Sequence, residues 1–256
     1  MKIIVCVKQV PARDSLLRVR SDGKWVDESD LNFEINEPDA YALEEALQIR
    51  DAAGGEVVVV SAGPDRAIST IREALAKGAD RGIHITLPEG STPDALATAR
   101  LLAAAIQPES PQLVLTGLQS EDSGSGQTGV VLAELLGLAH ATIIMHVEVT
   151  AADLKVKREL EDGWFQNVEL PLPALLTIQS GIKKLRYATL MGIKKAKGKP
   201  VQVIDAVATG VGLEAVLPME RLYPPRRTKQ NQTLTGAPDQ VAAELVQKLK
   251  FEARVL

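Results

Sequence analysis

The residues best suited to bind a ligand lie in one loop, where residues 116–130 read TGLQSEDSGSGQTGV. Its hydroxyl side chains can donate and accept hydrogen bonds, and its glycines let a ligand approach the backbone closely. The hydroxyls include those of Ser123, Ser125 and Thr128, and the glycines include Gly124, Gly126 and Gly129. An apolar run precedes the loop and an apolar-periodic segment follows it, which predicts a strand, a loop and then a helix. Because free N–H groups at a helix start favour an anion, the pattern predicts a phosphate cradle for a nucleotide.

Other chemistry finds little support in the sequence. The loop lacks the Gly-Lys-Ser/Thr ending of a Walker loop, so phosphoryl transfer is not indicated. The alternative to a cradle is a flexible surface loop whose Ser or Thr caps the helix, and loop chemistry alone leaves both open. No nucleophile–base pair or paired-carboxylate site is evident, so we expect no catalytic residues and no enzymatic activity. The three histidines and the single cysteine, Cys6, lack metal-ligand spacing, so we expect no metal site.

The composition is that of an ordinary globular protein. The chain has 256 residues, of which 45% are hydrophobic and 24% charged, and its net charge is −4. This charge gives no basic field to attract nucleic acid or anionic lipid, and the apolar runs are too short to span a bilayer. The N-terminal run reads as a buried strand, since it lacks a cleavage site for a signal peptide. With a lone cysteine, we expect a cytoplasmic protein without disulfides.

The elements that must position the loop alternate along the chain. Apolar runs at 2–7, 56–61, 82–86 and 112–116 predict strands, and helices are expected at 38–50, before Gly78, at 92–106 and from Val130. This order predicts a doubly wound, mainly parallel α/β sheet, a Rossmann-like nucleotide-binding domain. Ligands in such sheets bind beyond the carboxyl ends of the strands. The turn after Val7, the segment 61–63 and the loop 117–129 should meet there.

Beyond this unit, 141–149 reads as a strand, and 155–160 and 164–170 as a hairpin around 161–163. A short strand at 171–178 is expected to close the globular part. We therefore divide the chain into a nucleotide-binding domain (1–182), a basic loop (183–200) and a C-terminal arm (201–256) with a final amphipathic helix at 238–249.

The basic loop surrounds an apolar island at 187–191 with lysines. It lacks the interleaved aromatics that stack single-stranded nucleic acid, and it lacks the wide apolar helix face that enters membranes. An exposed leucine ringed by positive charge suits docking on an acidic partner that has an apolar pocket. The alternative is a solvated loop.

Six short motifs, in order and at matching spacing, resemble the beta subunit of electron-transfer flavoprotein over nearly the whole chain. They are residues 5–9 (VCVKQ), 60–64 (VSAGP), 76–81 (AKGADR), 127–129 (QTG), 158–159 (RE) and 186–190 (RYATL). The likeness is greatest to the bacterial form that serves trimethylamine dehydrogenase, through 117–120 (GLQS) and 173–179 (PALLTIQ).

The resemblance implies a heterodimer whose alpha subunit holds most of a redox-active FAD, while the beta subunit binds a structural AMP. It implies that electrons arrive from flavin dehydrogenases and leave toward the quinone pool through electron-transfer flavoprotein quinone oxidoreductase. The cofactor residues it implies are Cys6, Asn36, Glu37, Pro38, Asp39, Ala62, Gly117, Gln119, Asp122, Ser123, Ser125, Gln127, Thr128 and Gly129. Some members place aromatics at the positions of Arg13 and Pro38, and this departure argues against beta-subunit stacking on the flavin.

The basic loop matches the family's recognition loop for dehydrogenases. Leu190 falls on the anchor that enters a pocket of the partner, and Glu159 falls on a position that pairs with the mobile flavin domain. The partner-binding residues implied are Arg186, Tyr187, Ala188, Thr189, Leu190, Met191, Lys194, Lys195 and Glu159.

Two alternative functions stay open. In a flavin-bifurcating relative the cradle holds a second FAD instead of AMP, but such members usually carry an Asp-Gly-Asp-Thr-Ala-Gln-Val-Gly type of loop, from which residues 121–128 depart. A stand-alone adenine-nucleotide sensor or hydrolase on the same fold would need no alpha partner, and the arm from Val201 argues against it.

Overall fold

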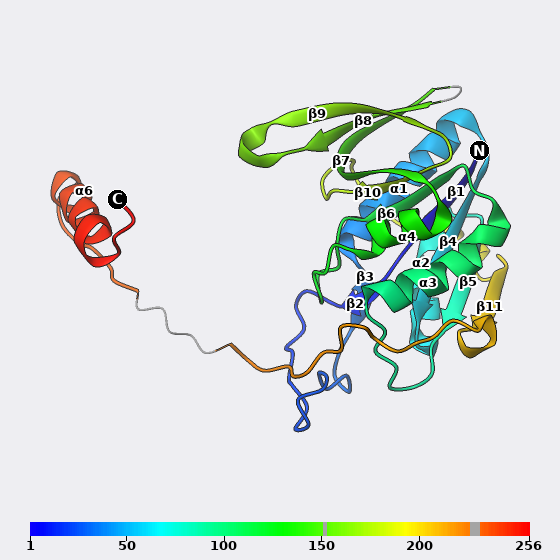
Figure 1. Cartoon of the computed structure of the whole chain (residues 1–256), viewed down its shortest axis with the longest axis horizontal. Helices are drawn as coiled ribbons and strands as arrows, with labels where there is room; N and C mark the ends of the chain where they lie inside the picture. The colour runs from blue at the N-terminus through cyan, green and yellow to red at the C-terminus, as the bar shows by residue number, and fades with distance from the viewer. Residues whose placement is uncertain (151–152, 226–230) are drawn as a thin grey trace.

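The computed structural model describes residues 1–150, 153–225 and 231–256. Within these residues, nine strands form one sheet in the order β11-β5-β4-β1-β6-β10-β7-β8-β9 (Figure 1). The strands are β1 Lys2–Cys6, β4 Glu56–Gly63, β5 Arg81–Thr86, β6 Leu113–Gly117, β7 Ala139–Val149, β8 Asp153–Glu159, β9 Phe165–Pro171, β10 Ala174–Ile178 and β11 Val201–Asp205. Strands from β11 to β7 run parallel, and β8 and β9 form an antiparallel hairpin. The predicted α/β class is confirmed.

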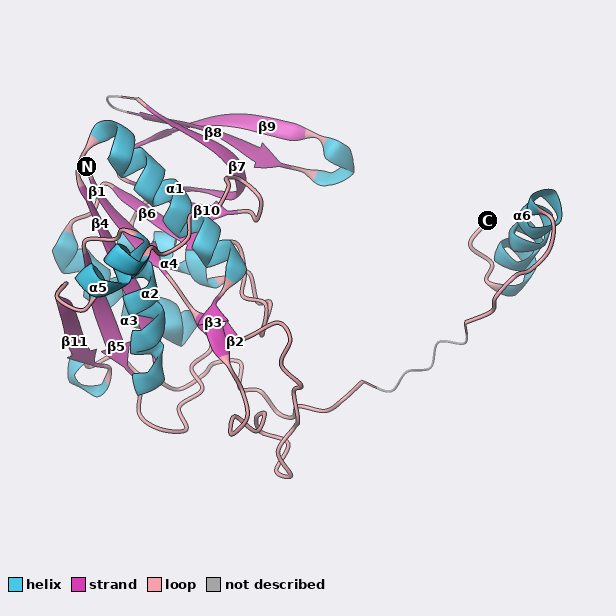
Figure 2. Cartoon of the chain, turned by 180° about the vertical axis from the view of Figure 1, so that it is seen from behind, coloured by secondary structure: helices cyan, strands magenta, loops and turns pink. Residues whose placement is uncertain are grey.

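Helices cover both faces of the sheet, as its strand sequences require. In β4, Val57 and Val59 pack into one hydrophobic cluster, and Val58 and Val60 pack into the other. Helices α1 (Glu37–Ala53) and α2 (Ile68–Lys77) contribute to the first cluster, and α3 (Ala95–Ile106) and α4 (Thr128–Leu136) to the second. Figures 1 and 2 show these two pairs from opposite sides. The chain turns back between β1 and β6, which creates the switch point where such folds bind ligands.

Local signals in the sequence explain where the helices begin and end. Helix α1 has Pro38 in its first turn and ends at Gly54, whose φ of 73° favours glycine. Helix α2 likewise ends at Gly78, with φ of 136°. The irregular segment 8–36 contains a small antiparallel pair that we did not expect, formed by β2 (Gln9–Pro11) and β3 (Phe33–Ile35).

After Ile178 the structure differs from the sequence-based expectation. The basic loop contains a short helix, α5 (Leu190–Ala196), and residues assigned to the arm form β11, which pairs with β5 at the edge of the sheet. β11 is a short strand at the edge of the sheet, and none of its residues is buried. Its sequence therefore shows only a weak apolar pattern.

The arm then runs on to α6 (Pro238–Gln247), which has no buried residue and stands apart from the sheet (Figure 1). Packing of the arm on an alpha subunit stays a prediction.

Candidate functional site

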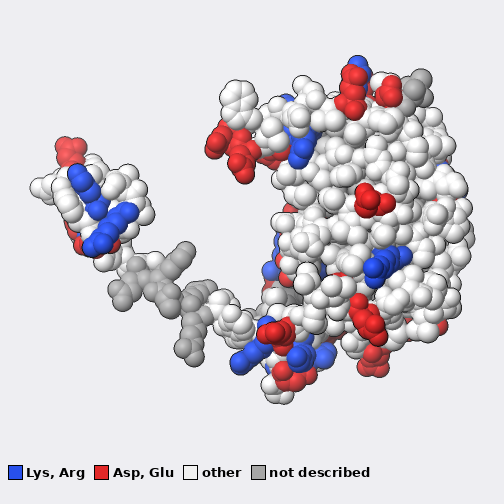
Figure 3. Space-filling model, in the orientation of Figure 1, with Lys and Arg blue, Asp and Glu red and all other residues white. Residues whose placement is uncertain are grey.

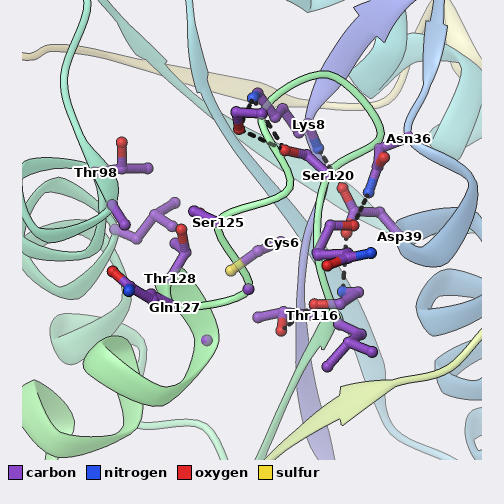
Figure 4. Close-up of a pocket in the computed structure, with 18 of the residues that line it drawn as sticks. Cys6, Lys8, Asn36, Asp39, Thr98, Thr116, Ser120, Ser125, Gln127 and Thr128 are labelled. Atoms are coloured by element: carbon purple, nitrogen blue, oxygen red, sulfur yellow. Dashed lines mark hydrogen bonds between the residues drawn. The ribbon is translucent and has the colours of Figure 1, made fainter. Parts of the chain in front are cut away.

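A pocket of about 860 Å³, part of it open to solvent, lies at the carboxyl ends of β1, β4 and β6. The loop after β6 forms one wall, and the segment that starts α3 forms another. Figure 4 shows Cys6 in the middle, with Ser125, Gln127 and Thr128 on one side and Thr116 and Asp39 on the other. The three segments that we expected to meet at this edge of the sheet therefore do meet.

Two of the helices that start beside the pocket, α3 and α4, differ in their caps. Asp94 caps α3, since its carboxylate accepts the N–H of Ala97 at 2.9 Å. No described side chain caps the start of α4, where Gln127 precedes Thr128. The first N–H groups of α4 thus remain available to a ligand, and an anion there would be favoured by the helix dipole.

Asn36 and Asp39, at the start of α1, hold the cradle loop in place. The Asp39 carboxylate accepts the backbone N–H groups of Lys8 and Gly117, each at 2.8 Å. The Asn36 amide donates to the Gln119 carbonyl at 3.0 Å and accepts the N–H of Glu121 at 2.9 Å. These side chains therefore position the loop, in addition to lining the pocket.

Glycines allow the close approaches on which this geometry depends. A Cβ on Gly117 would overlap the Asp39 carboxylate and lie 2.7 Å from Pro38. A Cβ on Gly129 would lie 2.7 Å from the side chains of both Thr116 and Thr177, forcing α4 away from the sheet. At Gly124 and Gly126 the φ angles are 60° and 62°, which L side chains rarely adopt.

The cation at the mouth of the pocket is Lys8. Its ammonium pairs with Asp122 at 2.6 Å and contacts the hydroxyls of Ser120 and Ser123. The pKa of Asp122 is lowered: burial alone would raise it, and the charge of Lys8 and hydrogen bonds outweigh that effect. Lys8 thereby ties the end of β1 to the loop, 114 residues away in sequence.

Burial dominates the ionisation of the two acidic groups deepest in the site. It raises the pKa of Asp39 to about 7, although the N–H groups of Lys8 and Gly117 act in the opposite direction. Burial also raises the pKa of the Cys6 thiol well above its usual range, with a smaller contribution from Asp39. Cys6 is thus a neutral thiol and part of an apolar wall, not a nucleophile.

The pocket brings together most of the cofactor residues expected from the resemblance. Three of them do not line it: Asp122, which instead pairs with Lys8, and Glu37 and Pro38, in the first turn of α1. The pocket is also lined by residues of a segment that we did not expect there, namely Pro93, Asp94, Ala95, Thr98 and Leu102. The segment from Pro93 follows strand β5. The rule that ligands bind beyond the carboxyl ends of the strands could therefore have predicted its place in the pocket.

Most of the expected partner-binding residues, those between Tyr187 and Lys195, form a second exposed surface. Tyr187 is 89% exposed, Leu190 88% and Met191 65%, and Lys194 and Lys195 are also exposed. Within the segment, Ala188 is half-buried, and the Thr189 hydroxyl caps α5 by accepting the N–H of Gly192 at 3.0 Å.

Two of the expected partner-binding residues make contacts within the chain. Arg186 pairs with Glu44 at 2.8 Å and with Asp51 at 3.1 Å. Glu159, at the end of β8, accepts a weak hydrogen bond of 3.4 Å from Gln179.

Two absences among the described residues bear on the site. Histidine, cysteine and carboxylate side chains of this part of the chain form no cluster able to hold a metal ion. Among the helices described, none has the length and apolar character needed to cross a membrane.

Comparison with known proteins identifies the family. Residues 24–209 match the family described as "Electron transfer flavoprotein domain". The chain is 41% identical to an electron transfer flavoprotein subunit beta from Bradyrhizobium diazoefficiens, over the whole of both chains. It is 37% identical to the one from Methylophilus methylotrophus, over 96% of this chain and 97% of the other, and 36% identical to the human one, over 100% and 99%. The chain therefore belongs to the electron transfer flavoprotein beta-subunit family.

Proposed function

We propose that this chain binds AMP in the pocket at the switch point, as a structural nucleotide. The observation that carries the proposal is the uncapped start of α4, bordered by the hydroxyls of Ser123, Ser125 and Thr128. Such a start with adjacent hydroxyls suits one phosphate group. The backbone beside Cys6 and Ala62 would read the adenine edge, at the other side of the pocket.

We further propose that the chain pairs with an alpha subunit that holds most of the FAD. The arm supports this, because α6 exposes the apolar side chains of Leu245 and Val246 and none of its own residues is buried. Figure 3 shows few charged side chains over the face that carries α3 and α4, and the cores of protein interfaces are depleted in charge. FAD would carry the electrons, while this chain would shape one side of its site and contribute Glu159 as a partner for the flavin domain.

The exposed surface around Leu190 would dock the electron donors, which we propose to be flavin dehydrogenases. Its apolar side chains would enter a pocket of the donor, and Lys194 and Lys195 would meet acidic groups at the rim. Electrons would then pass to electron-transfer flavoprotein quinone oxidoreductase and the quinone pool. The chain acts as a carrier subunit and supplies no catalytic residue.

The experiment that tests the nucleotide assignment is a cofactor count. The chain is co-expressed with its alpha partner, the complex is purified and denatured, and the released FAD and AMP are quantified. One FAD and one AMP per heterodimer would support the proposal. Two FAD and no AMP would indicate the flavin-bifurcating alternative, and a chain that purifies alone with bound nucleotide would indicate a stand-alone nucleotide-binding protein.

A further inference from the structure

Helix α5 carries the exposed docking surface, and it rests directly on α2. The two helices meet at Gly192. A Cβ added at Gly192 would overlap the carbonyl oxygen of Ala76 and lie 3.3 Å from the carbonyl carbon of the same residue. The two helices thus touch backbone to backbone, with Ala196 of α5 buried in the core beside them. Figure 2 shows α5 against α2 at this side of the sheet.

Two basic side chains join the same pair of elements in opposite directions. Arg72, on α2, donates from one nitrogen to the carbonyls of Ala196 and Lys199, at 2.8 and 2.7 Å. Lys199, after α5, donates to the carbonyls of Leu75 and Ala79, at 3.0 and 2.5 Å, and so caps the end of α2. Hydrogen bonds from charged donors are stronger than those between neutral groups, and these four close both ends of the contact.

Arg186 fixes the start of the docking segment to α1. Its guanidinium donates two hydrogen bonds to Glu44, which is only 4% exposed, and also pairs with Asp51. Its charge is thereby compensated within this chain. Lys194 and Lys195, in contrast, pair with no carboxylate of the described residues, so their charges remain available to a partner.

We propose that Arg72, Lys199, Arg186 and the bare backbone of Gly192 form a lock that holds the docking helix rigidly on α1 and α2. These are positioning residues: they fix the direction in which Leu190 projects without touching the partner. A preorganised surface loses less conformational entropy on binding, so the lock raises affinity for the dehydrogenase. The inference rests on the proposed docking function of this surface.

The test compares Gly192→Ala with Gly198→Ala in the purified heterodimer, using a flavin dehydrogenase that reduces the wild type. Alanine is the better helix former, so local propensity alone predicts that Gly192→Ala stabilises α5. The lock predicts the opposite, because the added methyl pushes α5 off α2. We expect the KM for the heterodimer to rise about tenfold, the scale of one lost charge-assisted hydrogen bond, with the limiting rate unchanged. Gly198→Ala should change nothing, since its Cβ has no neighbour closer than 3.8 Å.

Limited trypsin digestion gives a readout independent of docking. Cleavage after Lys194, Lys195 and Lys197 requires local opening of the segment. Gly192→Ala and Arg72→Ala should speed it, whereas Arg72→Lys should restore resistance, because one nitrogen serves both carbonyls. Unchanged cleavage and an unchanged KM in Gly192→Ala would overturn the lock, as would a failure of Arg72→Lys to restore resistance. Faster cleavage of Gly192→Ala and Arg72→Ala, together with a wild-type KM for the Leu190→Ala heterodimer, would support the lock and overturn the docking function.

Discussion

Truncation of Leu190 tests the proposed docking surface most directly. Leu190 is 88% exposed in this chain, so nearly all of its apolar side chain remains to be buried by a partner. The substitution Leu190→Ala removes three carbon groups, each worth about 0.8 kcal/mol when buried. The expected loss of binding free energy is about 2 kcal/mol, which corresponds to about a 30-fold rise in the KM of the dehydrogenase for the heterodimer.

The assay is reduction of the purified heterodimer by a flavin dehydrogenase, followed through the flavin absorbance at several heterodimer concentrations. AMP and FAD content and thermal stability should match the wild type, because the removed atoms contact little in this chain. Val207→Ala is the matched control: Val207 is 62% exposed but lies after β11, outside the docking segment.

A Leu190→Ala heterodimer that is reduced with the wild-type KM would refute the anchor assignment. A similar rise in KM for Val207→Ala would also refute the anchor assignment, since it would show that exposed apolar side chains outside the docking segment contribute equally to binding the dehydrogenase. A loss of FAD or AMP would indicate that the substitution disturbs the fold and not the docking.

Three other perturbations test the pocket and the sheet. Gly129→Ala should lose most of its AMP, because the new methyl displaces α4, whereas Gly212→Ala, which has open space around it, should retain AMP. Asp39→Asn offers one acceptor oxygen to the two N–H donors of Lys8 and Gly117. The binding free energy for AMP, measured by calorimetry, should therefore weaken by about 1–3 kcal/mol. An unchanged affinity would refute the positioning role of Asp39. Arg81 lowers the pKa of Glu109 to about 2, below its ordinary 4.5. The ion pair thus stabilises the fold above about pH 4.5 and is lost as pH falls toward 2, so Glu109→Gln should flatten that part of the acid-unfolding curve.

Much of the sheet could be predicted because each strand carries its own signal. The run of valines in β4 is buried on both faces, and Gly54 and Gly78 end the helices as expected. The hairpin of β8 and β9 also follows from its alternating pattern and the turn at Glu161–Gly163. These are local properties of a few consecutive residues, which is why the sequence suffices.

Helix α5 and strand β11 could not be predicted in this way. Seven residues that include Gly192 are too few to form a helix alone, and their stability comes from contacts with α2 made by Arg72, which lies more than a hundred residues earlier. The walls of the pocket pose the same difficulty. The pair of Lys8 and Asp122 joins distant segments, and its existence depends on which strands are neighbours. The resemblance supplied Asn36 and Asp39 as cofactor residues, but only the structure shows that they brace the loop.

The two surfaces proposed to act in electron transfer are built on separate contacts. On α2, Arg72 and Ala76 contact the docking helix, and neither lines the pocket. Glu44, which holds Arg186, lies on α1 with Asp39 but does not line the pocket either. The loop of the pocket, in turn, is held by Asn36, Asp39 and Lys8, whose hydrogen bonds described above go to segments other than α5. Arg72→Ala on α2 and Asp39→Asn on α1 should therefore act independently, since substitutions without shared partners add. The proposed nucleotide site can thus stay unchanged while the proposed docking surface varies.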